Sequence, residues 1–321
     1  KLQPWLARRR AVAARYNASR VVTHDQLRPA PPNLDGDHAY RKLNPALGLT
    51  WQALPTVDVY AGFSQGNRVP TPVELGCADA ANPCTLPNAL ASDPALKQVV
   101  ARTLEAGLRG QLAGGLDWNA GVFRTRSSDD ILFVGTSTSA GYFTNFGQTR
   151  RQGLELGLGG RQVGVDWRLN YSYLQATFRE SACLLSPSNS SRGQAAACTG
   201  GGQDDEILVA KGNTMPGLPA HSLKLALSWR AAAGLRLGAD IQGFSSQVAR
   251  GNENNRHQAG TATDLFGTSR TFAGPGRLPG YAVVNLAGEA DLGTGWQAFA
   301  KINNVFDRRY GTAAALATNP F

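Results

Sequence analysis

Four cysteines fall into two short-range pairs, and their chemistry depends on whether they bind each other or a metal. Cys77 and Cys84 lie in one polar segment, and Cys183 and Cys198 lie in another. Zinc sites favour CxxC spacing with histidines close by, and neither feature accompanies these cysteines. We therefore predict two disulfides, Cys77–Cys84 and Cys183–Cys198, which indicate an oxidising compartment.

A second group of residues combines carboxylates with aromatic rings on either side of a predicted loop, 134–141. Aromatic faces beside a few fixed polar groups suit a planar ligand such as an iron chelate. Solvated loop charges are the alternative interpretation of the same residues, and the same alternatives apply to Asp204-Asp205-Glu206 in a later loop. The predicted ligand-binding candidates are Asp129, Asp130, Phe133, Tyr142 and Phe143.

Motifs for catalysis are missing from the sequence. It contains no HExxH, GxSxG or P-loop pattern, and its four histidines lie far apart. The formal net charge is +9, but the arginines are scattered instead of clustering with aromatic residues as in nucleic-acid-binding proteins. We expect no enzyme activity, no cofactor, no bound metal and no nucleic-acid partner.

The elements that position these residues show an alternation of apolar and polar residues with period two. In Ser222–Trp229, for example, Leu223, Leu225, Leu227 and Trp229 alternate with small or polar residues. Such segments predict strands with one apolar face. The pattern predicts about eleven strands, at 11–27, 39–53, 56–68, 98–113, 116–133, 142–160, 163–180, 218–231, 234–250, 278–292 and 295–310.

Short and long connections alternate along these strands. The short ones lie at Ala53–Thr56, Ala113–Gly115, Gly160–Gly164, Ala231–Gly234 and Leu292–Gly295, and the long ones at 28–38, 69–97, 134–141, 181–217 and 251–277. Both cysteine pairs fall within long loops. Long strands with tight turns at one end and long loops at the other are typical of outer-membrane barrels. The sequence therefore predicts an all-β fold, an antiparallel transmembrane β-barrel.

Tryptophan supports the same interpretation, because five of the six tryptophans lie within about three residues of a short turn. Indole rings prefer the membrane–water interface, where the ring is apolar and the N–H stays hydrated. We predict that one rim of the barrel carries an aromatic girdle made of Trp51, Trp118, Trp167, Trp229 and Trp296.

Four segments carry a resemblance to a known family. They are Leu43–Trp51, Tyr60–Pro72, Asn145–Gly147 with Gln152–Leu156, and Ile302–Tyr310, the last reading Ile-Asn-Asn-Val-Phe-Asp-Arg-Arg-Tyr. In this order they resemble strands of TonB-dependent receptors. The resemblance implies a barrel of about 22 strands in the outer membrane of a Gram-negative bacterium, filled by an N-terminal plug. It also implies active uptake of a scarce ligand, most commonly a ferric siderophore, energised by TonB, ExbB and ExbD.

Residues 1–321 hold about half of such a barrel, so we expect this chain to be the C-terminal portion, without plug, early strands or final strand. The expected partners are a small-molecule ligand, outer-membrane lipid or lipopolysaccharide, and TonB-ExbB-ExbD through the missing plug. Haem, cobamides, other metal chelates and saccharides remain open as ligands. The alternative functions are a passive porin and a soluble all-β adhesin or enzyme domain.

Overall fold

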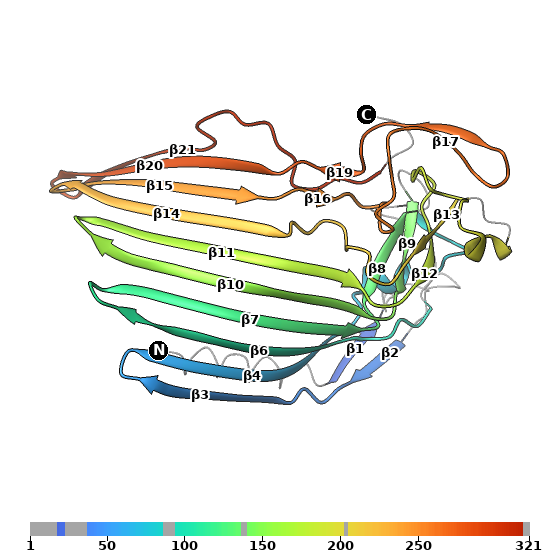
Figure 1. Ribbon diagram of the computed structural model, residues 1–321, viewed down its shortest axis with the longest axis horizontal. Helices are drawn as coiled ribbons and strands as arrows, with labels where there is room; N and C mark the ends of the chain where they lie inside the picture. Colours follow the sequence, from blue (N-terminus) through green and yellow to red (C-terminus); the bar gives the residue numbers. More distant parts are fainter. Residues whose placement is uncertain (1–17, 23–36, 86–93, 136–139, 202–204, 317–321) are drawn as a thin grey trace.

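The computed structural model describes residues 18–22, 37–85, 94–135, 140–201 and 205–316. Its main sheet has ten antiparallel strands, and strands that follow one another in this sheet are hydrogen-bonded neighbours. Figure 1 shows them side by side, with the short turns at one end and the longer connections at the other. The strands are β3 (Ala46–Leu54), β4 (Val57–Arg68), β6 (Val99–Leu112), β7 (Leu116–Ser128), β10 (Thr149–Gln162), β11 (Val165–Phe178), β14 (His221–Ala232), β15 (Leu235–Phe244), β20 (Tyr281–Gly293) and β21 (Trp296–Ile302).

The alternation in the sequence separates the main sheet into two faces. On β6, Leu104 and Leu108 lie on one face and are exposed, whereas Glu105 and Arg109 lie on the other. The cross-strand register continues this division, because Leu104 is opposite Phe63 while Glu105 is opposite Gly62. We call the first side the apolar face and the second the polar face. Exposed apolar side chains in rows are what a strand facing lipid on one side requires.

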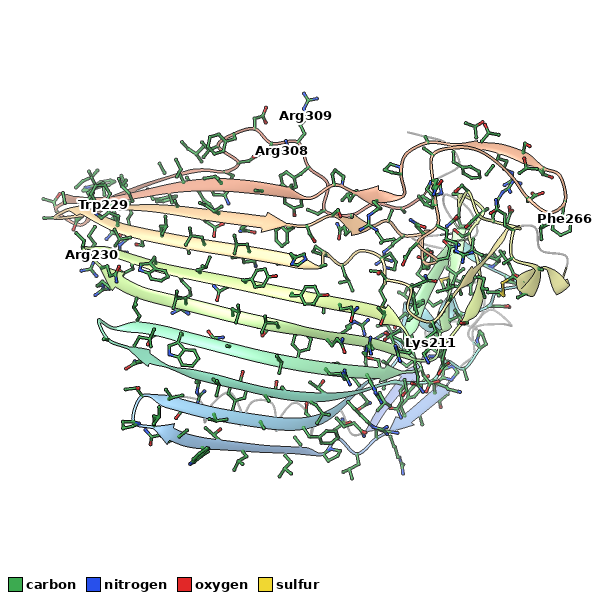
Figure 2. The ribbon with its side chains drawn as sticks, in the orientation of Figure 1. Lys211, Trp229, Arg230, Phe266, Arg308 and Arg309 are labelled. Carbon is green, nitrogen blue, oxygen red and sulfur yellow. A yellow bond between two sulfur atoms is a disulfide. The ribbon has the colours of Figure 1, made fainter. Side chains whose placement is uncertain are left out.

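All five predicted girdle tryptophans lie on the apolar face near the short turns. Trp118 is opposite Gly110 and Leu158, and Trp229 is opposite Val165 and Leu237. Trp51, Trp229 and Trp296 are 63%, 47% and 71% exposed, and Figure 2 labels Trp229 at the turn end of the sheet. Their location at a membrane interface stays a prediction.

The shorter elements gather at the other end of the main sheet (Figure 1). We call the described parts of 69–98, 129–148, 179–220 and 245–280 the cap. Its elements are α2 (Pro72–Gly76), β5 (Cys84–Thr85), β8 (Ile131–Gly135), β9 (Ala140–Asn145), β12 (Ala182–Leu185), the 3-10 helix η1 (Ala196–Gly201), β13 (Glu206–Val209), β16 (Gln247–Val248), β17 (Gly260–Thr263), β18 (Ser269–Phe272) and β19 (Arg277–Leu278).

The buried cores lie mainly in the cap and where it meets β11. One core contains Phe146, Phe178, Ile207 and Val209, together with Val134, Ala176, Leu184 and Met215. A smaller one contains Leu75 and Leu96. Among the described residues, no helix is long and apolar enough to cross a membrane.

The predicted strands 56–68, 98–113, 163–180 and 218–231 correspond to β4, β6, β11 and β14 within a few residues. Four others are too long because they run from the main sheet into the cap. The predicted strand 116–133 splits into β7 and β8 at Asp129, whose φ is 55°, and 142–160 splits into β9 and β10 at Gly147, whose φ is 96°. The strand 234–250 splits into β15 and β16, and 278–292 is interrupted at Pro279, which has no N–H to donate.

Two further strands differ at their ends. The predicted strand 39–53 is interrupted at Lys42–Pro45, so that β2 (Asp37–Arg41) pairs with β1 (Ala18–Val22) outside the main sheet. The predicted strand 295–310 ends at Ile302, because Asn304 adopts a φ of 52° and its side chain bonds the backbone of Arg308 in a turn. Of the predicted strand 11–27, only β1 is described, and residues 11–17 and 23–27 lie outside the described residues.

Candidate functional site

The five predicted ligand-binding residues come together around one small sheet of the cap. This sheet has the order β5-β9-β8 and follows directly from β7. Asp129 and Asp130 lie at the turn between β7 and β8, Phe133 lies on β8, and Tyr142 and Phe143 lie on β9. The five residues that were predicted to form one site are therefore neighbours in the fold. That they bind a ligand stays a prediction.

The two carboxylates of this group have different surroundings. Asp129, with a third of its side chain exposed, lies 3.5 Å from Nζ of Lys97. Asp130 is 13% exposed, accepts a hydrogen bond from Thr149 Oγ1 at 2.7 Å and forms an ion pair with Arg151 at 3.1 Å. Asp130 thus fixes the base of β10, while Asp129 remains accessible from solvent.

The three aromatic residues point to different neighbours. The rings of Phe133 and Phe143 are 5.1 Å apart at 59°, which is a favourable tilted pair. Phe143 also packs against the core of Leu75 and Leu96, while Tyr142 packs against the larger cap core. Burial raises the pKa of Tyr142, and the charge of Glu206 raises it further, so its hydroxyl stays protonated.

Residues 71–84, which lie against this small sheet, are held in place by the N-terminal capping of α2 and by a disulfide. Thr71 and Glu74 form a reciprocal capping box at the start of α2, and Glu74 also bonds Arg68. The structure pairs Cys77 with Cys84, and the N–H of Phe143 donates to the carbonyl of Cys77. The segment closed by this disulfide is therefore hydrogen-bonded directly to β9.

A second group of charged residues joins the loop after β11 to the loop after β15, and its buried ion pair was not predicted from the sequence. Arg192 forms an ion pair with Asp264 at 3.1 Å, and each side chain is 1% exposed. Asp205 joins them, since its carboxylate lies 3.4 Å from Arg192 and 3.2 Å from Arg270. Asp205 belonged to the predicted Asp204-Asp205-Glu206 cluster, of which Asp204 lies outside the described residues.

Polar side chains extend this contact between the two loops. Asn189 donates to the carbonyl of Gly251 at 2.8 Å, and the N–H of Ser190 donates to Nδ1 of His257 at 3.0 Å. Burial holds the pKa of His257 below its ordinary value, and burial raises the pKa of Glu253. The second predicted disulfide, Cys183–Cys198, ties the first of these loops together. No local motif marks Arg192 or Asp264, because they are 72 residues apart.

The polar face of the main sheet carries a charged surface below the cap. Arg109 is paired with Asp58 at 3.1 Å, and the hydroxyl of Tyr60 lies over Gly107 and Gly121. A Cβ at Gly107 would lie 2.5 Å from that hydroxyl, so the ring needs glycine there. Glu105, Glu155 and Arg168 lie on this face by register.

A long antiparallel meander with one apolar face, one charged face and a folded cap at one end defines the class of outer-membrane β-barrels. Residues 11–305 match the family model described as TonB dependent receptor-like, beta-barrel. The chain belongs to the TonB-dependent receptor family, as the resemblance predicted.

Solved structures share this fold. The siderophore receptor PiuA from Acinetobacter baumannii is 18% identical with a TM-score of 0.54, covering 88% of this chain and 34% of that one. The ferric yersiniabactin uptake receptor FyuA from Yersinia pestis is 16% identical with a TM-score of 0.57, covering 87% and 34%. The copper transporter OprC is 18% identical with a TM-score of 0.59, covering 90% and 38%. The chain therefore spans little more than a third of the length of these relatives.

Proposed function

We propose that the whole protein is an outer-membrane receptor that takes up a ferric siderophore, driven by TonB, ExbB and ExbD. The observation that carries this proposal is the combination of a ten-stranded sheet with an apolar face and an interlocked cap at its long-loop end. The apolar face suits lipid, and the cap suits a ligand arriving from outside the cell. Family membership supports active transport over a passive pore.

We propose further that residues 1–321 are the C-terminal part of the barrel and that a plug belongs to the whole protein. In the described part of the chain, β3 and β21 each pair along one side only. Unpaired strand edges are not tolerated in lipid, so further strands are required to close the sheet. This chain covers about a third of the length of the related receptors, which supports the same conclusion.

The ligand class is proposed from the relatives together with the cap. Two of the three are named for siderophores or their ferric complexes, and the third for copper. Asp129 and the Phe133–Phe143 pair offer a carboxylate beside aromatic rings, as a chelate site needs. Asp130 and Tyr142, which face partners within the protein, position this group.

Iron-limited growth tests the proposal. Cells lacking the gene should grow poorly when an added chelator removes free iron, and the full-length gene should restore growth. An Asp129→Asn/Phe133→Ala/Phe143→Ala gene, compared with an Arg236→Gln control at the turn end, should restore it less well. Equal growth with and without the gene would overturn siderophore uptake, and equal restoration by both variants would overturn the assigned residues.

A further inference from the structure

A row of arginines crosses the apolar face where the main sheet approaches the cap. Arg102 of β6 is directly opposite Arg126 of β7, and Arg126 is directly opposite Arg150 of β10. They share this face with Leu104 and Leu154 because they differ from them by two or four positions. Directly opposite side chains have their Cβ atoms about 5 Å apart, and like charges at that distance repel.

No carboxylate among the described residues compensates this row within ion-pair distance. Arg102 donates to the neutral side chain of Gln65, and Arg124, two residues before Arg126, donates to Gln152. Nε of Arg150 is buried without a hydrogen-bond partner, and Arg124, Arg126 and Arg179 are its charged neighbours.

The polar face of the same sheet is arranged differently. There, Arg109, Arg151, Arg161 and Arg236 each form an ion pair with an aspartate or a glutamate. Four arginines of the polar face are paired with carboxylates in this way, whereas Arg102, Arg126 and Arg150 form no ion pair with a described carboxylate. Their adjacent, uncompensated charges indicate that an anion from outside the chain compensates the row.

An apolar groove lies beside the row on the same face. It has a volume of about 850 Å³ and runs across the strands from β3 to β11. Two adjacent rows of side chains on the apolar face line this groove. One row includes Val122 and Leu154, and the other, which is nearer the cap, includes Phe63, Leu104, Arg124 and Gln152. Acyl chains suit this groove, which adjoins the basic row.

We propose that Arg102, Arg126 and Arg150, with Arg124 beside them, bind the phosphate groups of an outer-leaflet lipid whose acyl chains cover the adjoining groove. The proposal rests on the proposed location of this sheet in the outer membrane with the cap outside. Guanidinium groups are well suited to phosphate because they donate two parallel hydrogen bonds. A lipid with two phosphates on a sugar headgroup matches a row of several arginines better than a single phosphate.

Binding to the full-length receptor in neutral detergent tests the proposal, with lipid A carrying two phosphates as the probe and native mass spectrometry as the readout. The Arg102→Gln/Arg126→Gln/Arg150→Gln variant should bind lipid A on the order of a hundredfold more weakly, since each basic residue near a membrane surface contributes about 1 kcal/mol. Arg161→Gln/Arg230→Gln/Arg236→Gln removes the same charge at the turn end and should leave binding unchanged.

Two further arms identify the source of the anion. Dephosphorylated lipid A should bind the wild type and the row variant equally, and inorganic phosphate at millimolar concentration should not displace lipid A. Equal lipid A binding by both variants, or full displacement by inorganic phosphate, would overturn the proposal.

Thermal stability provides a second readout that does not depend on a binding constant. Without lipid A the row variant should unfold at a higher temperature than the wild type, because repulsion is removed. With lipid A the order should reverse. A row variant that is less stable in both conditions would contradict the charge argument. Neither lipid A binding nor thermal stability depends on uptake. Failure of the transport proposal would therefore not affect this test, and failure of this test would not affect the transport proposal.

Discussion

Nη1 of Arg192 lies 3.1 Å from Oδ2 of Asp264, and both side chains are withdrawn from solvent. The pair connects the loop between β11 and β14 with the loop between β15 and β20. Without Asp264, the buried guanidinium of Arg192 keeps only its longer contact of 3.4 Å with the more exposed Asp205. Losing the buried partner of a buried charge is strongly destabilising.

Asp264→Ala should therefore loosen both loops while leaving the main sheet intact. We expect amide hydrogen exchange in 186–193 and 251–270 to become faster by at least about tenfold, with no change in β6, β7 and β10. Arg236→Gln, which removes an exposed pair with Glu289, is the matched control and should change little. Uniform acceleration over the whole chain would contradict a local role.

Reduction of the cap disulfides should have unequal effects. The Cys183–Cys198 link closes a separation of 15 residues and Cys77–Cys84 closes only 7. The constraint on the unfolded chain grows with loop length, so Cys183→Ser/Cys198→Ser should cost about 2–4 kcal/mol of local stability and Cys77→Ser/Cys84→Ser less. Proteolysis of the native receptor measures both. Greater sensitivity of the Cys77/Cys84 variant would oppose this ranking.

The contact between the two loops should weaken as the pH falls. His257 accepts a hydrogen bond from the Ser190 N–H through Nδ1, and burial holds its pKa below the ordinary value. Below about pH 6.5, His257 binds a proton in the unfolded loops but not yet in the folded ones. The stability of the folded loops therefore declines as the pH falls, until the lowered pKa of His257 is passed. Glu253, whose pKa is raised, acts in the opposite sense, since its contribution is lost as the pH rises above about 4.5.

The protection factor of the Ser190 amide isolates the histidine. It should fall as the pH drops below about 6.5 in the wild type and stay level in His257→Asn, which keeps an acceptor that does not titrate. An equal decline in both proteins would show that another group titrates.

The tryptophans of the apolar face should report the membrane interface at the turn end. In bilayers, lipids brominated near the headgroup should quench their fluorescence more strongly than lipids brominated near the chain end. Replacing Trp51, Trp118, Trp167, Trp229 and Trp296 by Phe should abolish this difference. Stronger quenching from the bilayer centre, or quenching by aqueous iodide alone, would place this rim elsewhere.

Much of the main sheet follows from local sequence, whereas the cap does not. The alternation around Leu104 and Leu225 is a property of neighbouring residues, and it fixes both the strand and its faces. The interruptions at Asp129 and Gly147 depend on single positive φ values inside otherwise regular patterns, which periodicity cannot detect.

The candidate site divides in the same way. The carboxylate and aromatic group around Phe133 and Phe143 was predictable because the hairpin brings nearby residues together. Arg192 and Asp264 were not, because only the docking of two long loops brings them into contact. Asp205 appeared in the sequence as part of a solvated acidic run, although its partners are arginines from both loops.

Accumulation of ⁵⁵Fe supplied as a ferric siderophore tests the central claim most directly. Cells with the full-length gene should accumulate the label, and cells without it, or with the proton-motive force collapsed by a protonophore, should not. Accumulation that is equal with and without the gene, or that continues after the protonophore, would contradict an energised uptake receptor.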